Sequence, residues 1–357
     1  MSIDELRQIQ ANFVKELEDA DSGKQTSFPY ILHELANASL VSDNEVFQVL
    51  VVGGSVFKSA TLRGEDGKLV LLERAEKQQP RFNTKEDMLS FIESELDPQV
   101  KVIALNFAYP LKPIFENGRL DGILIKSMKE NRFEGLIGEK LGKTIEDYFR
   151  EKHHRDLTVS VGNDTICLLL SGLTKFTSHD IAGGIVGTGM NFALFLDKNK
   201  VVNLEAANFD KFPQTPAGKK IDEDSATPGN ALFEKEISGA YLHQQFNLLI
   251  EQEGIAHAPL SSTFDLDAMT QSDDTQLANI ARGLLDKSAS FVACAIGGIT
   301  LFKKKDMVFV MEGSLFWNAS HYKERIKELL IELVPHYNVT FVKVEDSPIF
   351  GGAKLIS

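Results

Sequence analysis

The chain has 357 residues, of which 43% are hydrophobic and 25% are charged, and these are ordinary values for a globular protein. This length exceeds the usual size of a single hydrophobic core, so we expect two domains. The chain carries 38 Lys and Arg against 51 Asp and Glu, a formal net charge of −13, and it has no long basic block. This balance argues against nucleic acid and against anionic membrane surfaces as partners, since both bind clustered Lys and Arg.

The N-terminal segment, residues 1–20, predicts an acidic amphipathic helix. It lacks the basic start and apolar core of a signal peptide, and we expect no run of membrane-spanning length, so the predicted location is cytoplasmic. Cys167 and Cys294 lie in apolar stretches and are interpreted as buried free thiols. His153 and His154 are adjacent in a charged stretch and are interpreted as solvent-facing, so no metal site is predicted.

The first half of the chain predicts an antiparallel meander followed by mixed strands and helices. The three meander strands are separated by Gly53-Gly54 and by a turn over 64–67. Strands are predicted over 46–52, 56–62, 68–74, 100–107, 123–127 and 157–161, and helices over 85–96, 136–152 and 165–173.

The second half repeats this pattern in outline, because it also begins with a strand, a glycine tip and a strand. The tip is Gly187-Thr188-Gly189, and a polar loop is expected over 209–229. Strands are predicted over 181–186, 191–196, 201–205, 308–311 and 339–344, and helices over 232–252, 275–302, 321–333 and from 351. The repeat favours two similar domains.

The glycine tips have two possible interpretations. A tip without Cβ atoms lets backbone N–H groups approach a phosphate, whereas a single tip is more often a plain hairpin turn. Neither Gly53-Gly54-Ser55 nor Gly187-Thr188-Gly189 is a Walker A loop, because no Gly-Lys-Ser/Thr precedes a helix. Their matching places, with a third pair at Gly351-Gly352, favour a nucleotide-binding site.

Three acidic residues stand at the ends of predicted elements. Asp164, in Asn163-Asp164-Thr165, follows a strand and opens a helix, so it could be a helix N-cap or a base that accepts a proton from a hydroxyl. Glu205 closes a strand and could be merely solvated. Glu234 lies in the first turn of a helix, where the helix dipole favours an acid in any case.

An ordered set of motifs from about residue 26 to the C-terminus resembles the hexokinase family. The longest match is Asp222-x-x-Ser225-x-x-Pro228-Gly229 followed by the segment 233–242, Phe-Glu-Lys-x-Ile-Ser-Gly-x-Tyr-Leu. The other matching segments are 27–29, 52–58, 107–110, 127–129, 163–165, 184–191, 203–209 and 313–316.

The resemblance implies an α/β protein of the actin-like ATPase fold, in which two ribonuclease-H-like domains flank a cleft. The small lobe would span 47–161, and the large lobe would span 1–46 and 162–357. The implied reaction moves the γ-phosphate of ATP, with Mg²⁺, onto the 6-hydroxyl of a hexose such as glucose, fructose or mannose. The protein would be a monomer or a homodimer.

The resemblance also implies a role for each matched residue. Asp164 would be the general base, and Lys129 would neutralise charge on the transferred group. The sugar would contact Asn163, Asn191, Glu205, Glu234 and Met128. The nucleotide would contact Gly53, Gly54, Ser55, Lys58, Gly187, Thr188, Gly189, Gly313, Ser314 and Gly351.

The chain departs from the family pattern mainly in the predicted small lobe. The family has an Asp at the position of Val51, an Asn at Val56, an Arg at Lys58, a Ser at Ala108 and a Thr at Met128. Two hypotheses therefore compete. One is an active hexose kinase with altered specificity or rate, and the other is a catalytically impaired relative that binds hexose as a sensor or regulator.

Overall fold

The computed structural model describes residues 1–127 and 131–357, which form two compact units. The first unit comprises residues 1–30, 184–192 and 204–342, and the second comprises residues 31–183, 193–203 and 343–357. The second unit contains the whole of the predicted small lobe, 47–161. The predicted lobe boundaries themselves stay a prediction.

A five-stranded mixed sheet forms the centre of the second unit, in the order β4-β3-β2-β5-β8. Strands β2 (Val46–Val52), β3 (Val56–Glu65) and β4 (Lys68–Gln78) form the predicted antiparallel meander. On its other side β2 pairs in parallel with β5 (Val102–Phe107), which pairs in parallel with β8 (Thr158–Gly162). The meander prediction is therefore confirmed.

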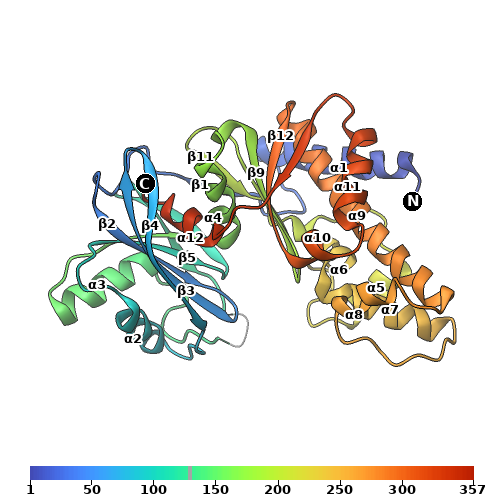
Figure 1. Ribbon diagram of the computed structural model, residues 1–357, viewed down its shortest axis with the longest axis horizontal. Coiled ribbons are helices and arrows are strands. Elements are labelled where there is room, and N and C mark those ends of the chain that lie inside the picture. Colours follow the sequence, from blue (N-terminus) through green and yellow to red (C-terminus); the bar gives the residue numbers. More distant parts are fainter. Residues whose placement is uncertain (128–130) are drawn as a thin grey trace. The chain divides into compact units, whose positions relative to one another are not determined.

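Helices cover both faces of this sheet, because alternate residues of its buried strands face opposite sides. Leu50 and Val52 of β2 belong to a core that includes Met88 of α2 (Lys85–Glu95) and Ile145 of α3 (Leu141–His153). Val49 faces the other side, where it contacts α12 (Ser347–Ala353), which also packs on α4 (Asp164–Ser171). Figure 1 shows α2 and α3 on one side of the sheet and α4 and α12 on the other.

Two predictions in this unit need correction. The predicted strand over 123–127 is the end of a hairpin made by β6 (Leu111–Glu116) and β7 (Arg119–Leu124). Its turn is Asn117-Gly118, and both residues have positive φ, as a tight hairpin turn requires. The predicted helix over 136–152 begins only at Leu141, in α3.

The remaining strands belong to a six-stranded sheet of order β1-β11-β10-β9-β12-β13, and the division into units passes through β9 and β10. In the second unit, β1 (Ile31–Glu34) and the end of β10 (Met190–Phe195) both pair antiparallel with β11 (Lys200–Asn203). In the first unit, β12 (Met307–Glu312) pairs in parallel with β13 (Val339–Val342). Strand β9 spans Ile181–Val186.

The first unit is mainly helical, and two of its helical predictions need correction. The expected polar loop over 209–229 contains α5 (Pro216–Asp224), which begins with Thr215 as N-cap and Pro216 in the first turn. The expected helix over 232–252 is two helices that meet at Ser238. The helices of this unit are α1 (Ile3–Asp21), α5, α6 (Leu232–Ile237), α7 (Gly239–Gln252), α8 (Thr263–Met269), α9 (Thr275–Lys303), α10 (Ser314–Asn318) and α11 (Tyr322–Leu333).

Helix α9 is the core helix of this unit. Within the described residues it alone is long and apolar enough to cross a membrane, which corrects the expectation that no run reaches this length. In its most apolar 18-residue window, 83% of the residues are buried, as in a helix at the centre of a folded core.

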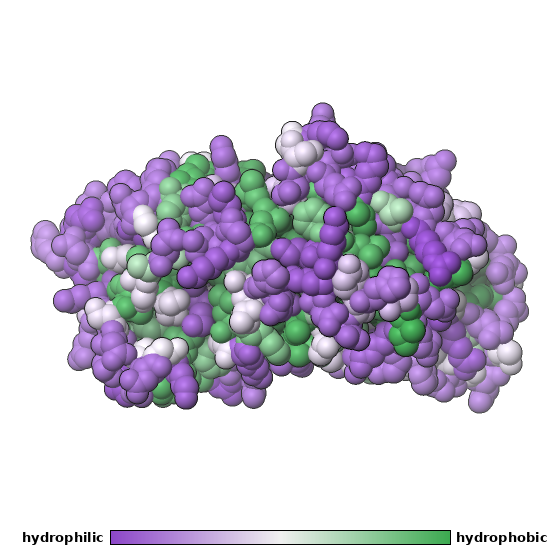
Figure 2. All heavy atoms as spheres, turned by 90° about the horizontal axis from the view of Figure 1, so that it is seen from above, coloured by the Kyte–Doolittle hydropathy of each residue, from purple (hydrophilic) through white to green (hydrophobic). Residues whose placement is uncertain are grey.

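On the face of the molecule drawn in Figure 2, hydrophilic residues cover most of the surface, and apolar residues form smaller groups between them.

Candidate functional site

Three predicted sugar-binding residues gather in the first unit around the start of β10. The backbone N–H of Met190 donates to Oε2 of Glu234, at 2.9 Å, although the two residues are 44 positions apart. The Nδ2 of Asn191 donates to Oε1 of Glu205 at 3.4 Å, and its Oδ1 accepts from the N–H of Ala206 at 3.2 Å. The structure thus brings Asn191, Glu205 and Glu234 together.

The two carboxylates of this cluster influence one another. Burial raises the pKa of Glu234, and the negative charge of Glu205 raises it further, whereas the Met190 N–H opposes the shift. Glu205 has φ of +52°, a left-handed conformation that is rare outside glycine. The backbone is therefore strained at one of the residues that the sequence resemblance predicts to bind sugar.

The glycine tip between β9 and β10 is tied to the start of α7. The N–H of Gly187 donates to the carbonyl of Gly189, at 2.9 Å. Gly239 N–H donates to the carbonyl of Gly187 at 2.8 Å, and Ala240 N–H donates to that of Thr188 at 3.2 Å. A Cβ at position 189 would lie 2.8 Å from Oε2 of Glu234. Glycine at this position therefore leaves room for the carboxylate.

Gly313 packs its backbone directly against this tip. It has φ of +111°, and a Cβ there would lie 2.0 Å from the carbonyl oxygen of Val186. A Cβ on Gly187 would in turn lie 3.1 Å from Cα of Gly313. The glycines at 187 and 313 are thus explained by the close packing of two backbone segments, and the phosphate contacts predicted for Gly187, Thr188, Gly189, Gly313 and Ser314 stay a prediction.

In the second unit, Asn163 and Asp164 lie between β8 and α4. Asn163 is the N-cap, because its Oδ1 accepts from the N–H of Thr165 at 3.0 Å. Asp164 is the first helical residue and is half-buried, and its Oδ1 accepts from the N–H of Thr165 at 2.8 Å and from Oγ1 at 3.3 Å. Of the two interpretations given for this motif, the capping role therefore belongs to Asn163.

The predicted small-lobe tip, Gly53-Gly54-Ser55, is held by the phenol of Tyr109. Its hydroxyl donates to the carbonyl of Gly53 at 3.0 Å and accepts from Nε2 of Gln79 at 3.1 Å. It also accepts from Nδ2 of Asn131 at 2.7 Å. Tyr109 is buried, and it therefore joins the tip to two other segments of the second unit.

Two of the remaining predicted residues, Lys129 and Met128, lie outside the described residues. Lys58 forms an ion pair with Glu76, at 3.2 Å. Gly351 allows α12 to approach α4, because a Cβ there would lie 1.7 Å from the carbonyl oxygen of Cys167. The glycine at 351 is explained by this packing, and its contact with the nucleotide stays a prediction.

Sequence reasoning missed two contributors. The backbone N–H of Met190 could not be identified, since every residue except proline has a backbone N–H and the residue type therefore gives no signal for this contact. The hydroxyl of Tyr109 could have been found, because Tyr109 lies in the matched segment 107–110 next to Pro110.

The described residues contain no group of three or more His, Cys, Asp or Glu that could hold a metal ion.

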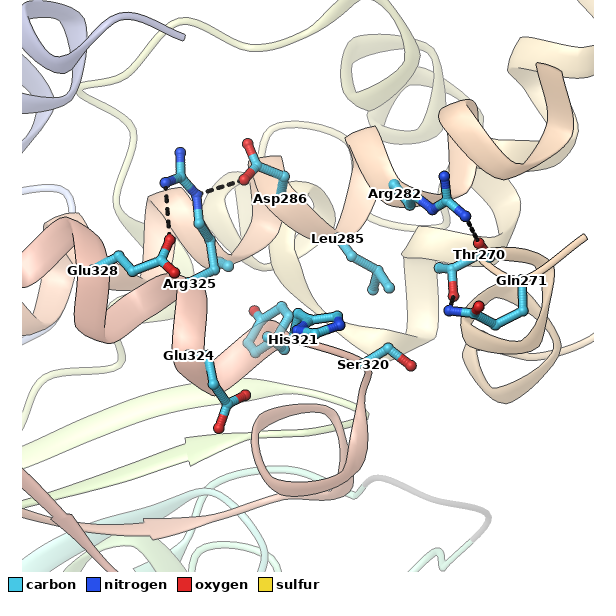
Figure 3. Close-up of a pocket in the computed structure, with 12 residues that line it drawn as sticks. Thr270, Gln271, Arg282, Leu285, Asp286, Ser320, His321, Glu324, Arg325 and Glu328 are labelled. Carbon is cyan, nitrogen blue, oxygen red and sulfur yellow. Dashed lines mark hydrogen bonds and ion pairs between the residues drawn. The ribbon is translucent and has the colours of Figure 1, made fainter. Parts of the chain in front are cut away.

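The first unit has a hollow of about 390 Å³ at the surface, bordered by α9 and α11 (Figure 3). Its charged side chains are largely satisfied locally, because Arg325 pairs with Asp286 at 2.6 Å and with Glu328 at 3.5 Å, and Arg282 donates to the carbonyl of Thr270. None of the predicted site residues lines this hollow.

The chain matches a family model described as hexokinase over residues 181–252 and 248–357. A curated Arabidopsis thaliana protein, Hexokinase-4, is 23% identical to this chain, over 88% of the chain and 80% of the relative. Hexokinase-7 of Oryza sativa is 27% identical, over 56% of the chain and 50% of the relative. The chain thus spans most of the first relative and half of the second.

Solved structures agree with these sequence matches. A Schistosoma mansoni hexokinase complexed with glucose matches with a TM-score of 0.77 and 17% identity, over 100% of this chain and 95% of that one. A second hexokinase crystal structure matches with a TM-score of 0.79 and 19% identity, over 100% and 96% of the two chains. The predicted α/β class and actin-like ATPase fold are therefore confirmed.

Proposed function

The chain is a distant member of the hexokinase family, and from this premise we propose that it is an ATP-dependent hexose kinase. The proposed reaction transfers the γ-phosphoryl group of ATP to the 6-hydroxyl of glucose or a related hexose. The observation that carries the proposal is the cluster of Asn191, Glu205 and Glu234 beside the glycine tip at 187–189.

This cluster suits a polyhydroxylated ligand. Two carboxylates accept hydrogen bonds from sugar hydroxyls, and the amide of Asn191 can donate as well as accept. Hydrogen bonds to charged groups are strong and directional, so a few of them fix both affinity and orientation. The Schistosoma mansoni structure, which is a complex with glucose, supports a hexose as the ligand class.

In the proposed reaction Asp164 is the general base. Its carboxylate accepts the proton of the hexose 6-hydroxyl while the hydroxyl oxygen attacks the γ-phosphorus, and the bond to the β-phosphate oxygen breaks to release ADP. A positioned base contributes roughly 10²–10⁴-fold in rate. Asp164 is the first residue of α4, and its side chain accepts from the N–H of Thr165 at 2.8 Å.

The described residues contain no group of three or more His, Cys, Asp or Glu that could hold a metal by protein ligands alone. The glycines at 187, 189 and 313 make room for neighbouring protein atoms, and the proposed contact of this tip with ATP phosphates rests on the family resemblance. Mg²⁺ is commonly held by substrate phosphates with few protein ligands, and it would neutralise charge on the phosphates. Val51 stands where the family has an Asp, so this chain offers one fewer carboxylate than expected.

The proposal is tested by ADP release from purified protein with ATP, Mg²⁺ and a panel of glucose, fructose, mannose and glucosamine. We expect release that depends on at least one sugar and exceeds the rate without sugar. Absence of sugar-dependent release across the panel would contradict the proposed activity.

Replacement of Glu234 by Gln should raise KM for the hexose by roughly 10–100-fold, because a hydrogen bond to a charged group contributes about 1.5–3 kcal/mol. Steady-state kinetics measures this change. Since the pKa of Glu234 is raised, lowering the pH should protonate it and raise KM in the wild type. The variant should lose that pH dependence, and an unchanged KM would remove Glu234 from the sugar site.

A second function is favoured by one observation, the loss of a carboxylate at Val51. A hexose-binding sensor would be stabilised by sugar without turnover, because a ligand that binds only the native state raises its apparent stability. Thermal shift with the same sugars, run beside the ADP assay, distinguishes the two functions.

Val51→Asp tests the missing carboxylate directly. Val51 is 7% exposed at the end region of β2, so a carboxylate there needs a cation or water to offset its desolvation. We expect the apparent affinity for Mg²⁺ to rise about tenfold, the effect of one charge-assisted contact, while thermal stability without ligand falls. Titration of activity with Mg²⁺ measures the first effect, with Val51→Asn as the uncharged control. Equal Mg²⁺ dependence in both variants would contradict the expectation.

A further inference from the structure

Strand β4 is an edge strand whose C-terminal half is uncovered. It stands at the end of the five-stranded order, and in the described part of the chain it pairs only with β3. Residues 72–78 are all exposed. Exposed edges of this kind present unpaired N–H and C=O groups that can bind another strand.

The charges on this edge are self-complementary. The segment Glu73-Arg74-Ala75-Glu76-Lys77 reads as acid, base, neutral, acid, base. If a second copy pairs antiparallel with Ala75 opposite Ala75, Glu73 faces Lys77 and Arg74 faces Glu76. By the two-fold symmetry each of these pairs occurs twice. Residues directly opposite on antiparallel strands point to the same face, so each pair can make contact.

Other arrangements lack this match. A shift that places Arg74 opposite Arg74, or Glu76 opposite Glu76, puts like charges together at the centre. A parallel in-register pair would set every charge against its own kind, which is destabilising. Charges on an edge strand usually prevent association, but here they permit one register and oppose its neighbours.

We propose that the chain forms a two-fold symmetric homodimer through antiparallel pairing of β4 edges centred on Ala75. The dimer is isologous, so the same patch serves on both copies. Arg74 already pairs with Asp346, Lys77 with Glu95 and Glu76 with Lys58 within one chain, so the second copy extends existing charge networks. Glu73 forms no ion pair among the described residues, and Lys77 of the second copy supplies one.

Cysteine trapping tests the register. The natural Cys167 and Cys294 are buried and do not compete. In the proposed pair the two Cα atoms at position 75 lie about 4.5–5.5 Å apart, within disulfide range. Ala75→Cys should therefore cross-link rapidly under mild oxidation, in comparison with Lys198→Cys at another exposed site of the same unit. Equal rates for the two variants would overturn the proposal.

A mixing experiment makes the test stricter. Leu72 lies at a register shift in the pairing of β4 with β3, so the regular positions 73 and 77 are used. Glu73→Cys and Lys77→Cys should each fail to cross-link alone, because their own copies lie about 13 Å apart along antiparallel strands. A mixture of the two should cross-link, since 73 faces 77. Cross-linking of either variant alone at the rate of Ala75→Cys would show a different register and would overturn the proposal.

Charge reversal tests the energetics without cysteine. Sedimentation equilibrium should show that Glu73→Lys weakens dimerisation about tenfold or more, since two opposite-charge pairs become like-charge pairs. The double variant Glu73→Lys with Lys77→Glu should dimerise more tightly than either single variant. Glu139→Lys, the same charge change at another exposed position, should match the wild type. A sedimentation profile of Glu73→Lys indistinguishable from the wild type would contradict the proposed interface.

Discussion

Asp164→Ala should lower kcat for hexose phosphorylation by roughly 10²–10⁴-fold, the contribution expected of a positioned general base. Asp164 is half-buried at the start of α4, and the N-cap of that helix is Asn163. Removal of the carboxylate should therefore leave the helix formed. Hexose binding, measured as thermal stabilisation by the sugar, should be largely retained, because the predicted base acts on the proton in transfer and not on the bound ground state.

Two control variants make this test specific. Asp164→Asn keeps the shape of the side chain and removes its basicity, so it should lose activity to a similar extent. Asp156→Ala removes an exposed carboxylate from the same unit, one that is paired with Arg150 at 3.0 Å, and should leave kcat unchanged. Wild-type turnover in Asp164→Ala would show that another group accepts the proton.

Lys287→Met should lower the free energy of unfolding by about 3–5 kcal/mol, the range found when one partner of a buried ion pair is removed. Lys287 of α9 contacts Glu236 of α6 at 2.6 Å, and the Glu236 side chain is 0% exposed. Glu236 also accepts from the N–H of Thr215, at 2.7 Å. Without Lys287 a buried carboxylate would keep only neutral donors. Denaturant-induced unfolding of the first unit measures this loss of unfolding free energy.

The double variant Glu236→Met with Lys287→Met is the matched control. It removes both charges, so it should be more stable than Lys287→Met alone, since apolar replacement of a whole buried pair is often tolerated. A double variant as unstable as the single one would show that packing, and not the unpaired charge, causes the loss. The result bears on the site because Glu236 lies two residues from Glu234 on α6.

Much of the fold could be predicted because its buried strands are apolar runs of strand length. Strand β2, Val-Phe-Gln-Val-Leu-Val-Val, has six buried residues in seven positions, and such a short run that ends at Gly53-Gly54 is typical of a buried strand. The errors lie where polar sequence forms regular structure. The hairpin of β6 and β7 mixes Lys, Pro, Glu and Arg with apolar residues, although its Asn117-Gly118 turn was a usable signal. Helix α5 had a signal as well, in Thr215-Pro216.

The sequence predicted which residues belong to the candidate site but not how they are arranged in space. Asp164, Glu205 and Glu234 can be matched to family motifs, because a motif depends on residue type and spacing, and both can be read from the sequence. Their arrangement depends on contacts across long sequence separations, such as Met190 with Glu234. The positive φ of Glu205 is likewise set by the surrounding chain and not by the residue itself. The sequence resemblance therefore named the candidate residues, whose roles stay a prediction, and the structure identified their local partners.

The phenol of Tyr109 has a mechanical consequence. One hydroxyl bonds at once to the carbonyl of Gly53, to Nε2 of Gln79 and to Nδ2 of Asn131. Asn131 stands two positions after Lys129 in the sequence, and Gly53 opens the predicted phosphate tip. Any shift of the tip that preserves these bonds must carry Asn131 with it. A single oxygen atom thus couples Asn131 to the backbone of the tip at Gly53, so a substitution that displaces one of them is expected to displace the other.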